Sequence, residues 1–198
     1  MGADPLIEIF PMPLVRLDFP ELLLSLAYAG PDNFTGRAVY GRADGWLHQN
    51  ALPPLQRAMT LAHQQGLRLR IFDAFRPQEA QWILWHHTPD PEFLADPRQG
   101  SAHSRGIALD LTLTDASGRD LPMGTAYDSF TRHSHHGNTE IEAAAQANRH
   151  LLLGIMTAAG WDFNRNEWWH YQLFRAETYP LLSDSALPEP IMPKNQSA

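Results

Sequence analysis

Two short segments that lie far apart in the chain carry side chains that work together only if the fold brings them to one place. The first runs from Ser101 to Asp110 and includes His103, and the second runs from Glu167 to His170. Between them they supply two imidazoles and two carboxylates, which is the donor set of a hydrolytic zinc centre. The fold is therefore expected to be built around the contact between these segments.

The size of the chain predicts a single domain. It has 198 residues, of which 43% are hydrophobic, and this is enough to bury one substantial core. We therefore assign residues 1–186 to one domain. Residues 187–198 are polar and interrupted by proline, as is typical of a tail on or off the surface, and we expect catalysis not to need them.

Charge and composition exclude several classes of partner. The net charge is -7 and no cluster of Lys or Arg is present, whereas a nucleic-acid partner requires a basic face. The N-terminal stretch lacks the basic and apolar regions of a secretion signal, and no apolar run approaches the roughly 18 residues of a membrane span. We expect a cytoplasmic protein that acts on a small molecule, and the sequence indicates no particular oligomeric state.

Three segments have the periodicity and the end signals of helices, at residues 53–66, 78–87 and 139–160. Proline suits the first turn of a helix and glycine its end, and Pro53, Pro77, Gly66 and Gly160 stand in such places. The third segment opens with a threonine and a glutamate, at 139 and 142, in the pattern of a capping box. We expect each segment to form a helix.

Three other segments are expected to be strands, at residues 67–72, 107–113 and 168–174. The first alternates apolar with mostly polar residues, which is typical of a half-buried strand, and the last is rich in aromatic residues. Strands interleaved with segregated helices, without a βαβ rhythm, predict an α+β fold. This fold has a small, mainly antiparallel sheet with flanking helices, and the zinc site lies at a cavity of the sheet.

His103 and Asp110 are the first pair of candidate metal ligands. His103 lies in a loop before Gly106, and Asp110 follows between the apolar residues Leu109 and Leu111. A carboxylate in an apolar strand is costly to bury unless it is paired or bound to a metal. Both side chains reach one site only if the loop bends around Gly106. For His103 alone, the alternative is an ordinary surface or core histidine.

Glu167 and His170 are the second candidate pair. A spacing of three places side chains on one face of a helix but on opposite faces of a strand, and Trp168, Trp169 and Tyr171 favour a strand. We therefore expect a bend at Glu167 that lets both groups reach one cavity. The alternative is an edge-strand glutamate beside a histidine in an aromatic cluster.

The number of donors indicates how the chemistry is divided. The chain has no cysteine, so two histidines and one aspartate hold the metal, for which zinc is the expected ion, and a fourth position stays open for water. Glu167 is then left as a general base that takes a proton from this water and passes it to a leaving amine. Such a site cleaves an amide bond.

Six segments resemble the VanX-type D-alanyl-D-alanine dipeptidases in order and spacing, from about residue 26 to about residue 174. They are YAGPDNFTG (28–36), DAFRP (73–77), SAHSRGIALDLTL (101–113), PMG (122–124), SHH (134–136) and EWWHY (167–171). The stretch between Trp85 and Ser101, which resembles a lid or cavity wall of the family, is short here and rich in proline and aspartate. Substrate range is the property that such a difference affects most.

The resemblance implies roles for individual residues. His103, Asp110 and His170 correspond to the ligands of one zinc ion, and Glu167 corresponds to the general base. Arg76 corresponds to an arginine that stabilises the oxyanion. An arginine after a strand and before a proline presents a fixed positive charge to a tetrahedral intermediate, and a structural salt bridge is the alternative.

Substrate contacts are implied at four more positions. Asp128 resembles the acid that binds the ammonium group of the substrate, and Ser101 resembles a residue that binds it through its hydroxyl. Tyr28 and Tyr40 are assigned to the same pocket, with core packing as the alternative for both. The three histidines at 133, 135 and 136 are not assigned to the metal, although one of the last two is a candidate to orient a ligand.

The expected function is zinc-dependent hydrolysis of D-alanyl-D-alanine to two D-alanine molecules, with a small zwitterionic D,D-dipeptide as the partner. One alternative is a D,D-carboxypeptidase or endopeptidase that acts on longer peptidoglycan stem peptides. Another is a zinc-binding module without activity, which would need neither Glu167 nor Arg76. A closed pocket with an acid at the ammonium end favours the dipeptidase, and an open groove favours the first alternative.

Overall fold

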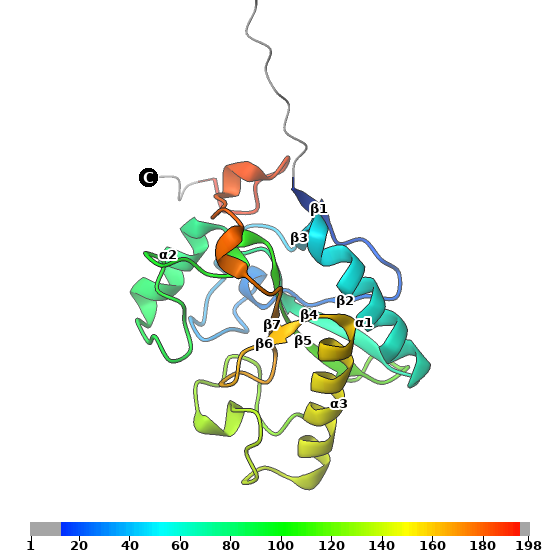
Figure 1. The fold of residues 1–198 in the computed structure, drawn as a ribbon. Coiled ribbons are helices and arrows are strands. Elements are labelled where there is room, and N and C mark those ends of the chain that lie inside the picture. The colour runs from blue at the N-terminus through cyan, green and yellow to red at the C-terminus, as the bar shows by residue number, and fades with distance from the viewer. Residues whose placement is uncertain (1–12, 195–198) are drawn as a thin grey trace, which may run out of the picture.

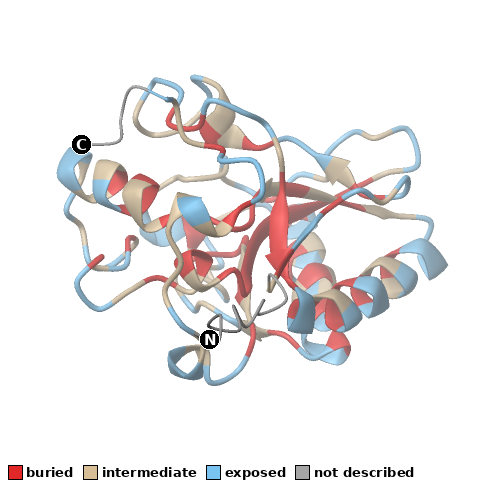
Figure 2. Ribbon diagram, turned by 90° about the horizontal axis from the view of Figure 1, so that it is seen from above, coloured by how far each residue is buried: buried red, intermediate tan, exposed pale blue. Residues whose placement is uncertain are grey.

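A five-stranded sheet forms the centre of the computed structural model, which describes residues 13–194 (Figure 2). The strands lie in the order β2 (Leu23–Leu24), β4 (Arg68–Asp73), β5 (Ala108–Thr114), β7 (His170–Gln172) and β6 (Asp162–Phe163). β2 is parallel to β4, and the other neighbouring pairs are antiparallel. A separate antiparallel pair joins β1 (Leu14–Arg16) to β3 (Trp46–His48). The predicted mainly antiparallel sheet is confirmed.

Three helices flank the sheet, as predicted: α1 (Leu52–Gln64), α2 (Gln78–His87) and α3 (Ala143–Ala159). α1 and α3 contact each other along one side of the sheet, whereas α2 lies on the other side of the molecule (Figure 1). Short 3-10 helices occur in the described connections, namely η1 (Ala27–Ala29), η2 (Gln49–Ala51), η3 (His103–Arg105), η4 (Arg132–Ser134), η5 (Ala176–Thr178) and η6 (Asp184–Ala186). The α+β fold class is confirmed.

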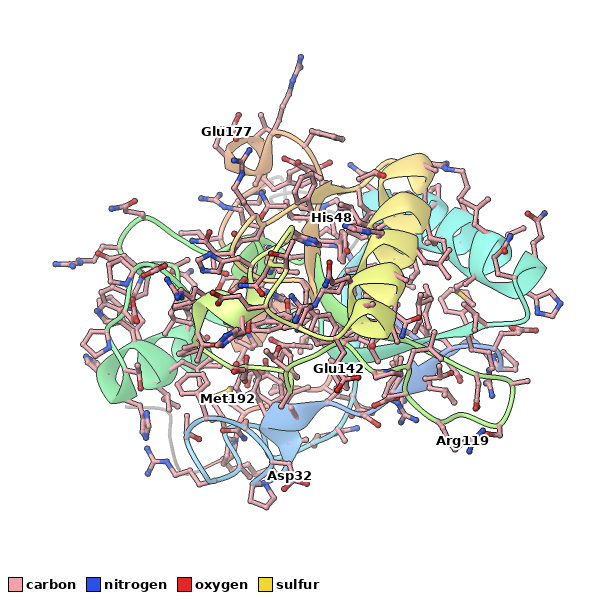
Figure 3. The ribbon with its side chains drawn as sticks, turned by 90° about the horizontal axis from the view of Figure 1, so that it is seen from below. Asp32, His48, Arg119, Glu142, Glu177 and Met192 are labelled. Carbon is pink, nitrogen blue, oxygen red and sulfur yellow. The ribbon has the colours of Figure 1, made fainter. Side chains whose placement is uncertain are left out.

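The helix ends follow the expected signals in part. Gly66 and Gly160 have positive φ angles of 70° and 103° just beyond α1 and α3, a conformation that glycine adopts without strain. The capping box predicted for α3 is wrong. Glu142 is itself the N-cap residue, and among the described residues its side chain makes no capping hydrogen bond; it lies at the start of α3 in Figure 3. Thr139 is then too far from the first helical residue, Ala143, to cap it.

The main core lies between the sheet and the pair α1 and α3. It includes Leu55 of α1, Leu113 of β5 and Met156 of α3, all fully buried. β5 is buried along its whole length, and β4 alternates buried with half-buried residues as predicted. Because β5 is covered on both faces, a carboxylate within it, that of Asp110, needs polar partners.

Two segments differ from the expectation. The strand predicted at residues 168–174 is confined to β7, because the chain forms a turn at Trp168 and Trp169. In the predicted tail, Leu187 and Ile191 are buried in one apolar cluster with Leu84 of α2, so this part packs onto the domain. Residues 195–198 of the tail, and residues 1–12 of the stretch searched for a secretion signal, lie outside the described residues. No helix within residues 13–194 is both long and apolar enough to cross a membrane.

Candidate metal centre and active site

The register of β5 and β7 brings two of the predicted ligands together. Asp110 and His170 are direct partners across this antiparallel pair, so their side chains extend from the same face of the sheet. The Nδ1 atom of His170 lies 3.0 Å from Oδ1 of Asp110. Residues far apart in the sequence therefore meet because two strands pair.

His103 reaches the same point from η3. The chain turns at Gly106, whose φ of 69° is in the left-handed region, and this is the bend expected from the sequence. The Nε2 atom of His103 lies 3.2 Å from Oδ1 of Asp110 and 3.1 Å from Nδ1 of His170. The donor atoms of these three residues lie within 4.8 Å of one another.

This donor set fits a divalent metal ion. A tetrahedral zinc ion with ligands at about 2.0–2.1 Å keeps neighbouring donor atoms about 3.3 Å apart, close to the separations of His103, Asp110 and His170. Nδ1 of His103 is 2.7 Å from the carbonyl oxygen of Ala74, which only accepts, so this nitrogen carries the proton and Nε2 is free to bind metal. The other ring nitrogen of His170 contacts Oε1 of Gln172 at 3.1 Å. Both rings are thus oriented as metal-bound histidines are.

Glu167 lies beside this centre in the turn that precedes β7. The bend expected from the sequence is present, and Oε2 of Glu167 is 3.9 Å from Nδ1 of His170. The same oxygen accepts a hydrogen bond of 2.8 Å from Nδ2 of Asn164. Burial raises the pKa of Glu167 to about 7, although the neighbouring His170 opposes this rise. A carboxylate with such a pKa is suited to take up and release a proton near neutral pH.

The Ser-His-His segment holds the turn of Glu167 through its backbone. The carbonyl oxygen of Ser134 accepts a hydrogen bond from the amide of Trp168 at 3.0 Å, and the amide of His136 donates to the carbonyl of Arg165 at 2.9 Å. The side chains point elsewhere: His136 packs against Phe163, and in the part of the chain that is described neither His135 nor His136 has a hydrogen bond to a candidate ligand. The expectation that one of them orients a ligand finds no support.

Arg76 is buried and held by two neighbours. Its Nε donates to Oδ2 of Asp73 at 2.8 Å, and its Nη1 donates to Oε1 of Gln81 at 3.0 Å. The guanidinium also lies over the ring of Tyr28, 5.0 Å from the centroid. Nη2 is left 3.6 Å from Oδ2 of Asp110. Arg76 therefore makes a structural salt bridge with Asp73, which was the alternative expected from the sequence, and it also lines the cavity at the candidate metal centre.

A cavity of about 220 Å³ opens onto the centre. This is smaller than the roughly 300–1,000 Å³ of sites for drug-sized ligands, so a small molecule fits it best. Its lining includes Ser101, Tyr28 and Asp128 together with the metal-centre residues. Tyr40 is absent from the lining. It is buried, and its hydroxyl donates to Oδ1 of Asp73 at 2.9 Å, so it supports the partner of Arg76.

Two of the lining residues have free hydrogen-bonding capacity. Oγ of Ser101 accepts the amide hydrogen of His103 at 3.2 Å, and its own hydroxyl hydrogen has no acceptor within the part of the chain that the structure describes. Asp128 adopts a φ of 56° and accepts a hydrogen bond of 2.9 Å from the hydroxyl of Tyr28. Burial, and next the charge of Asp110, raise the pKa of Asp128 well above its usual value. A cation placed beside Asp128 would offset both effects.

The chain is similar throughout most of its length to one protein family. The model of the family described as "D-ala-D-ala dipeptidase" matches residues 12–188. The chain belongs to this family. It is thus a member of a metallopeptidase family, as the sequence predicted, and the His and Asp donors described above lie within the matched region.

Curated relatives agree with this assignment. A D-alanyl-D-alanine dipeptidase of Escherichia coli is 46% identical over 166 residues, which cover 84% of this chain and 86% of the relative. One from Enterococcus faecium is 33% identical, covering 77% of this chain and 86% of the relative. A solved structure of the vancomycin resistance D,D-pentapeptidase VanY in complex with Zn(II) aligns with a TM-score of 0.46 at 14% identity, covering 67% of this chain and 75% of that one.

Four residues of the site had no role predicted from the sequence. They are the partners of Arg76, Asp110 and Glu167, namely Asp73, Gln81, Tyr127 and Asn164. The sequence could have indicated Asp73 and Asn164, because each stands three residues before its partner, Asp73 at the end of a strand and Asn164 just before a turn. For Tyr127 and Gln81 the contact follows from how separate segments pack.

Proposed function

We propose that this protein hydrolyses the dipeptide D-alanyl-D-alanine to two D-alanine molecules, with one zinc ion held by His103, Asp110 and His170. The observation that carries the proposal is the convergence of three donor atoms, 3.0 to 3.2 Å apart, beside a buried glutamate in a small cavity. The names of the curated relatives indicate the substrate.

Glu167 is the proton carrier of the reaction. When bound, zinc polarises the substrate carbonyl and makes water more acidic. The carboxylate of Glu167 takes a proton from the attacking water while the water oxygen bonds to the carbonyl carbon. As the carbon–nitrogen bond breaks, the same group gives that proton to the leaving amine. A pKa of about 7, raised by burial, suits both transfers.

Arg76 stabilises the negative charge that develops on the carbonyl oxygen. Its Nε and Nη1 are held by Asp73 and Gln81, so the charge is fixed in place before the substrate arrives. Fixed charges of this kind need no rearrangement during the reaction, which makes them effective in a site with little water. Tyr40 fixes the arginine indirectly, through Asp73.

Asp128 and Ser101 bind the substrate. The carboxylate of Asp128 binds the ammonium group, because a half-buried acid beside Asp110 favours a cation as its partner. The hydroxyl of Ser101, with its free hydrogen, donates to the substrate. Tyr28 contacts Asp128 and keeps that carboxylate directed at the cavity.

The same features favour a dipeptide over a longer stem peptide. In a longer peptide the nitrogen next to the penultimate D-alanine is acylated and carries no charge, so it would leave the carboxylate of Asp128 without a cation. The small volume of the cavity has the same effect. The cytoplasmic location stays a prediction.

The test is to incubate the zinc-loaded protein with D-alanyl-D-alanine, with its L,L isomer and with a stem pentapeptide, and to measure free D-alanine. We expect release from D-alanyl-D-alanine alone. Cleavage of only the pentapeptide would instead assign a carboxypeptidase, and no cleavage with bound zinc would leave a binding module.

The variant Glu167→Gln tests the proton carrier. We expect zinc to bind as in the unaltered protein and turnover to fall by about 10²–10⁴-fold, since the amide has similar shape but accepts no proton. Zinc content is measured by atomic absorption and turnover by release of D-alanine. Unchanged turnover would remove Glu167 from this role.

A further inference from the structure

A stack of two phenylalanines stands at the mouth of the cavity, and no step of the proposed reaction uses it. Phe93, between α2 and η3, and Phe130, between β5 and η4, both line the cavity. Their ring centroids are 5.2 Å apart, and the ring planes are inclined by only 8°. Both side chains are half-buried, and the neighbouring lining residues Pro91 and Glu92 are exposed. The stack thus lies where the cavity meets solvent.

Other side chains hold the stack from both sides. The ring of Phe130 is 4.9 Å from that of Phe34, and the ring of Phe93 is 5.9 Å from that of His135. Nε2 of His135 lies 3.6 Å from a carboxylate oxygen of Glu92, the residue before Phe93. Aromatic contacts of this kind join segments that are far apart in the chain. The two rings therefore form a fixed wall made by two separate loops.

The position of Phe130 indicates which end of the substrate this wall faces. Phe130 follows Asp128 by two residues in one loop, and both line the cavity. Under the proposed function, Asp128 binds the ammonium group of the dipeptide. The stack thus lies on the amino side of the substrate.

We infer that the stack of Phe93 and Phe130 determines substrate length by blocking any extension at the amino end of the dipeptide. This inference rests on the proposed function. An ammonium group ends at Asp128, whereas an acyl group on the same nitrogen has to continue into the space that the rings occupy. Asp128 selects by charge and the wall selects by size, so the two act independently.

The experiment compares D-alanyl-D-alanine with N-acetyl-D-alanyl-D-alanine. The kcat/KM of each substrate is measured from released D-alanine. The readout is the kcat/KM of the acetylated substrate divided by that of D-alanyl-D-alanine. Removal of one ring in Phe130→Ala is expected to raise this ratio about tenfold or more, because even a single methylene group in a pocket changes selectivity by about 10–200-fold. Phe93→Ala is expected to act in the same direction, and Phe130→Leu less strongly.

Phe174→Ala is the matched control, since Phe174 is 60% exposed and does not line the cavity. Its ratio is expected to equal that of the unaltered protein. Circular dichroism checks folding, and Phe93→Ala and Phe130→Leu decide the matter if Phe130→Ala does not fold.

An unchanged ratio in the folded variants overturns the inference while leaving the proposed function intact. Equal cleavage of both substrates by the unaltered protein also overturns the inference, and it contradicts the role of Asp128 in binding the ammonium group, while hydrolysis of D-alanyl-D-alanine still stands. If the unaltered protein leaves D-alanyl-D-alanine uncleaved, the proposed function fails, and the inference fails with it.

Discussion

Asp110 uses both oxygens of its carboxylate. Oδ1 faces the imidazoles of His103 and His170, while Oδ2 accepts a hydrogen bond of 3.0 Å from the hydroxyl of Tyr127 and lies near Arg76. Burial alone would raise the pKa of Asp110, but its two histidine neighbours hold it well below its usual range. The carboxylate is therefore kept ionised, which is the form that binds metal.

Tyr127→Phe tests whether the second oxygen matters for metal binding. Loss of the hydroxyl removes the hydrogen bond that orients Oδ2 of Asp110. Removing a hydrogen-bond partner of a metal ligand lowers metal affinity by about 10–100-fold. The affinity is measured by competition for zinc with a chelator. Tyr171→Phe is the control, because the hydroxyl of Tyr171 has no hydrogen-bond partner among the described residues. Equal zinc affinity in both variants would show that Tyr127 does not position the ligand.

The types of residue in the site could be predicted from the sequence, but their partners could not. Asp110 is recognisable because a carboxylate is costly inside an apolar strand unless it is paired or bound to a metal, and His103, Glu167 and His170 are recognisable from the family motifs in which they stand. Which hydroxyl reaches Oδ2 of Asp110 depends on a loop that follows β5 and folds back over it, and no local pattern encodes that contact.

At the scale of elements, the site depends on where β7 begins. Trp168 and Trp169 have a high β propensity, yet the amide of Trp168 bonds to the carbonyl of Ser134, outside the sheet, and the strand starts only at His170. Because of this late start, Glu167 lies in a turn and reaches the same cavity as His170. Propensity predicted the strand correctly, and a long-range backbone contact determined its length.

Gly106→Ala tests the turn between η3 and β5. A Cβ at this position would lie 2.5 Å from Cδ2 of the buried Leu14, and the φ of 69° strains any side chain. We expect the free energy of unfolding to fall by about 2 kcal/mol or more and zinc affinity to fall with it, because His103 would shift.

Gly66→Ala is the matched control for this substitution. Its φ of 70° is nearly the same, but no atom of residues 13–194 lies within 4 Å of the added Cβ. The free energy of unfolding of Gly66→Ala is expected to fall by only about 1 kcal/mol, which is the cost of a side chain at a positive φ, and its zinc affinity is expected to stay unchanged. Urea denaturation gives both stabilities. A zinc affinity for Gly106→Ala equal to that of Gly66→Ala would mean that the turn does not position His103.

At the scale of the whole molecule, the centre concentrates negative charge. Three carboxylates are buried there, those of Asp73, Asp110 and Glu167, and Asp128 is nearby, whereas Arg76 is the one buried arginine lining the described cavity. Burial raises the pKa of Asp73, and Asp110 adds to this, while Arg76 opposes it. The apolar core and the helices follow from composition and periodicity. Under the proposed function the excess of buried acid serves to bind cations, since it is unfavourable without them.

Removal of the metal is therefore expected to destabilise the entire domain. Under the proposed function zinc binds the folded centre, so at a free concentration about 1,000-fold above its Kd it adds about 4 kcal/mol of stability. For a domain of this size that corresponds to a fall in Tm of about 8–16 °C when a chelator removes the ion. Scanning calorimetry with and without chelator measures the shift, and added zinc is expected to reverse it.

In Asp110→Asn, which lacks one charged donor of the centre, the chelator is expected to change Tm much less. Equal Tm values for the unaltered protein with and without chelator would contradict the assignment of His103, Asp110 and His170 as a metal site that forms only in the folded chain.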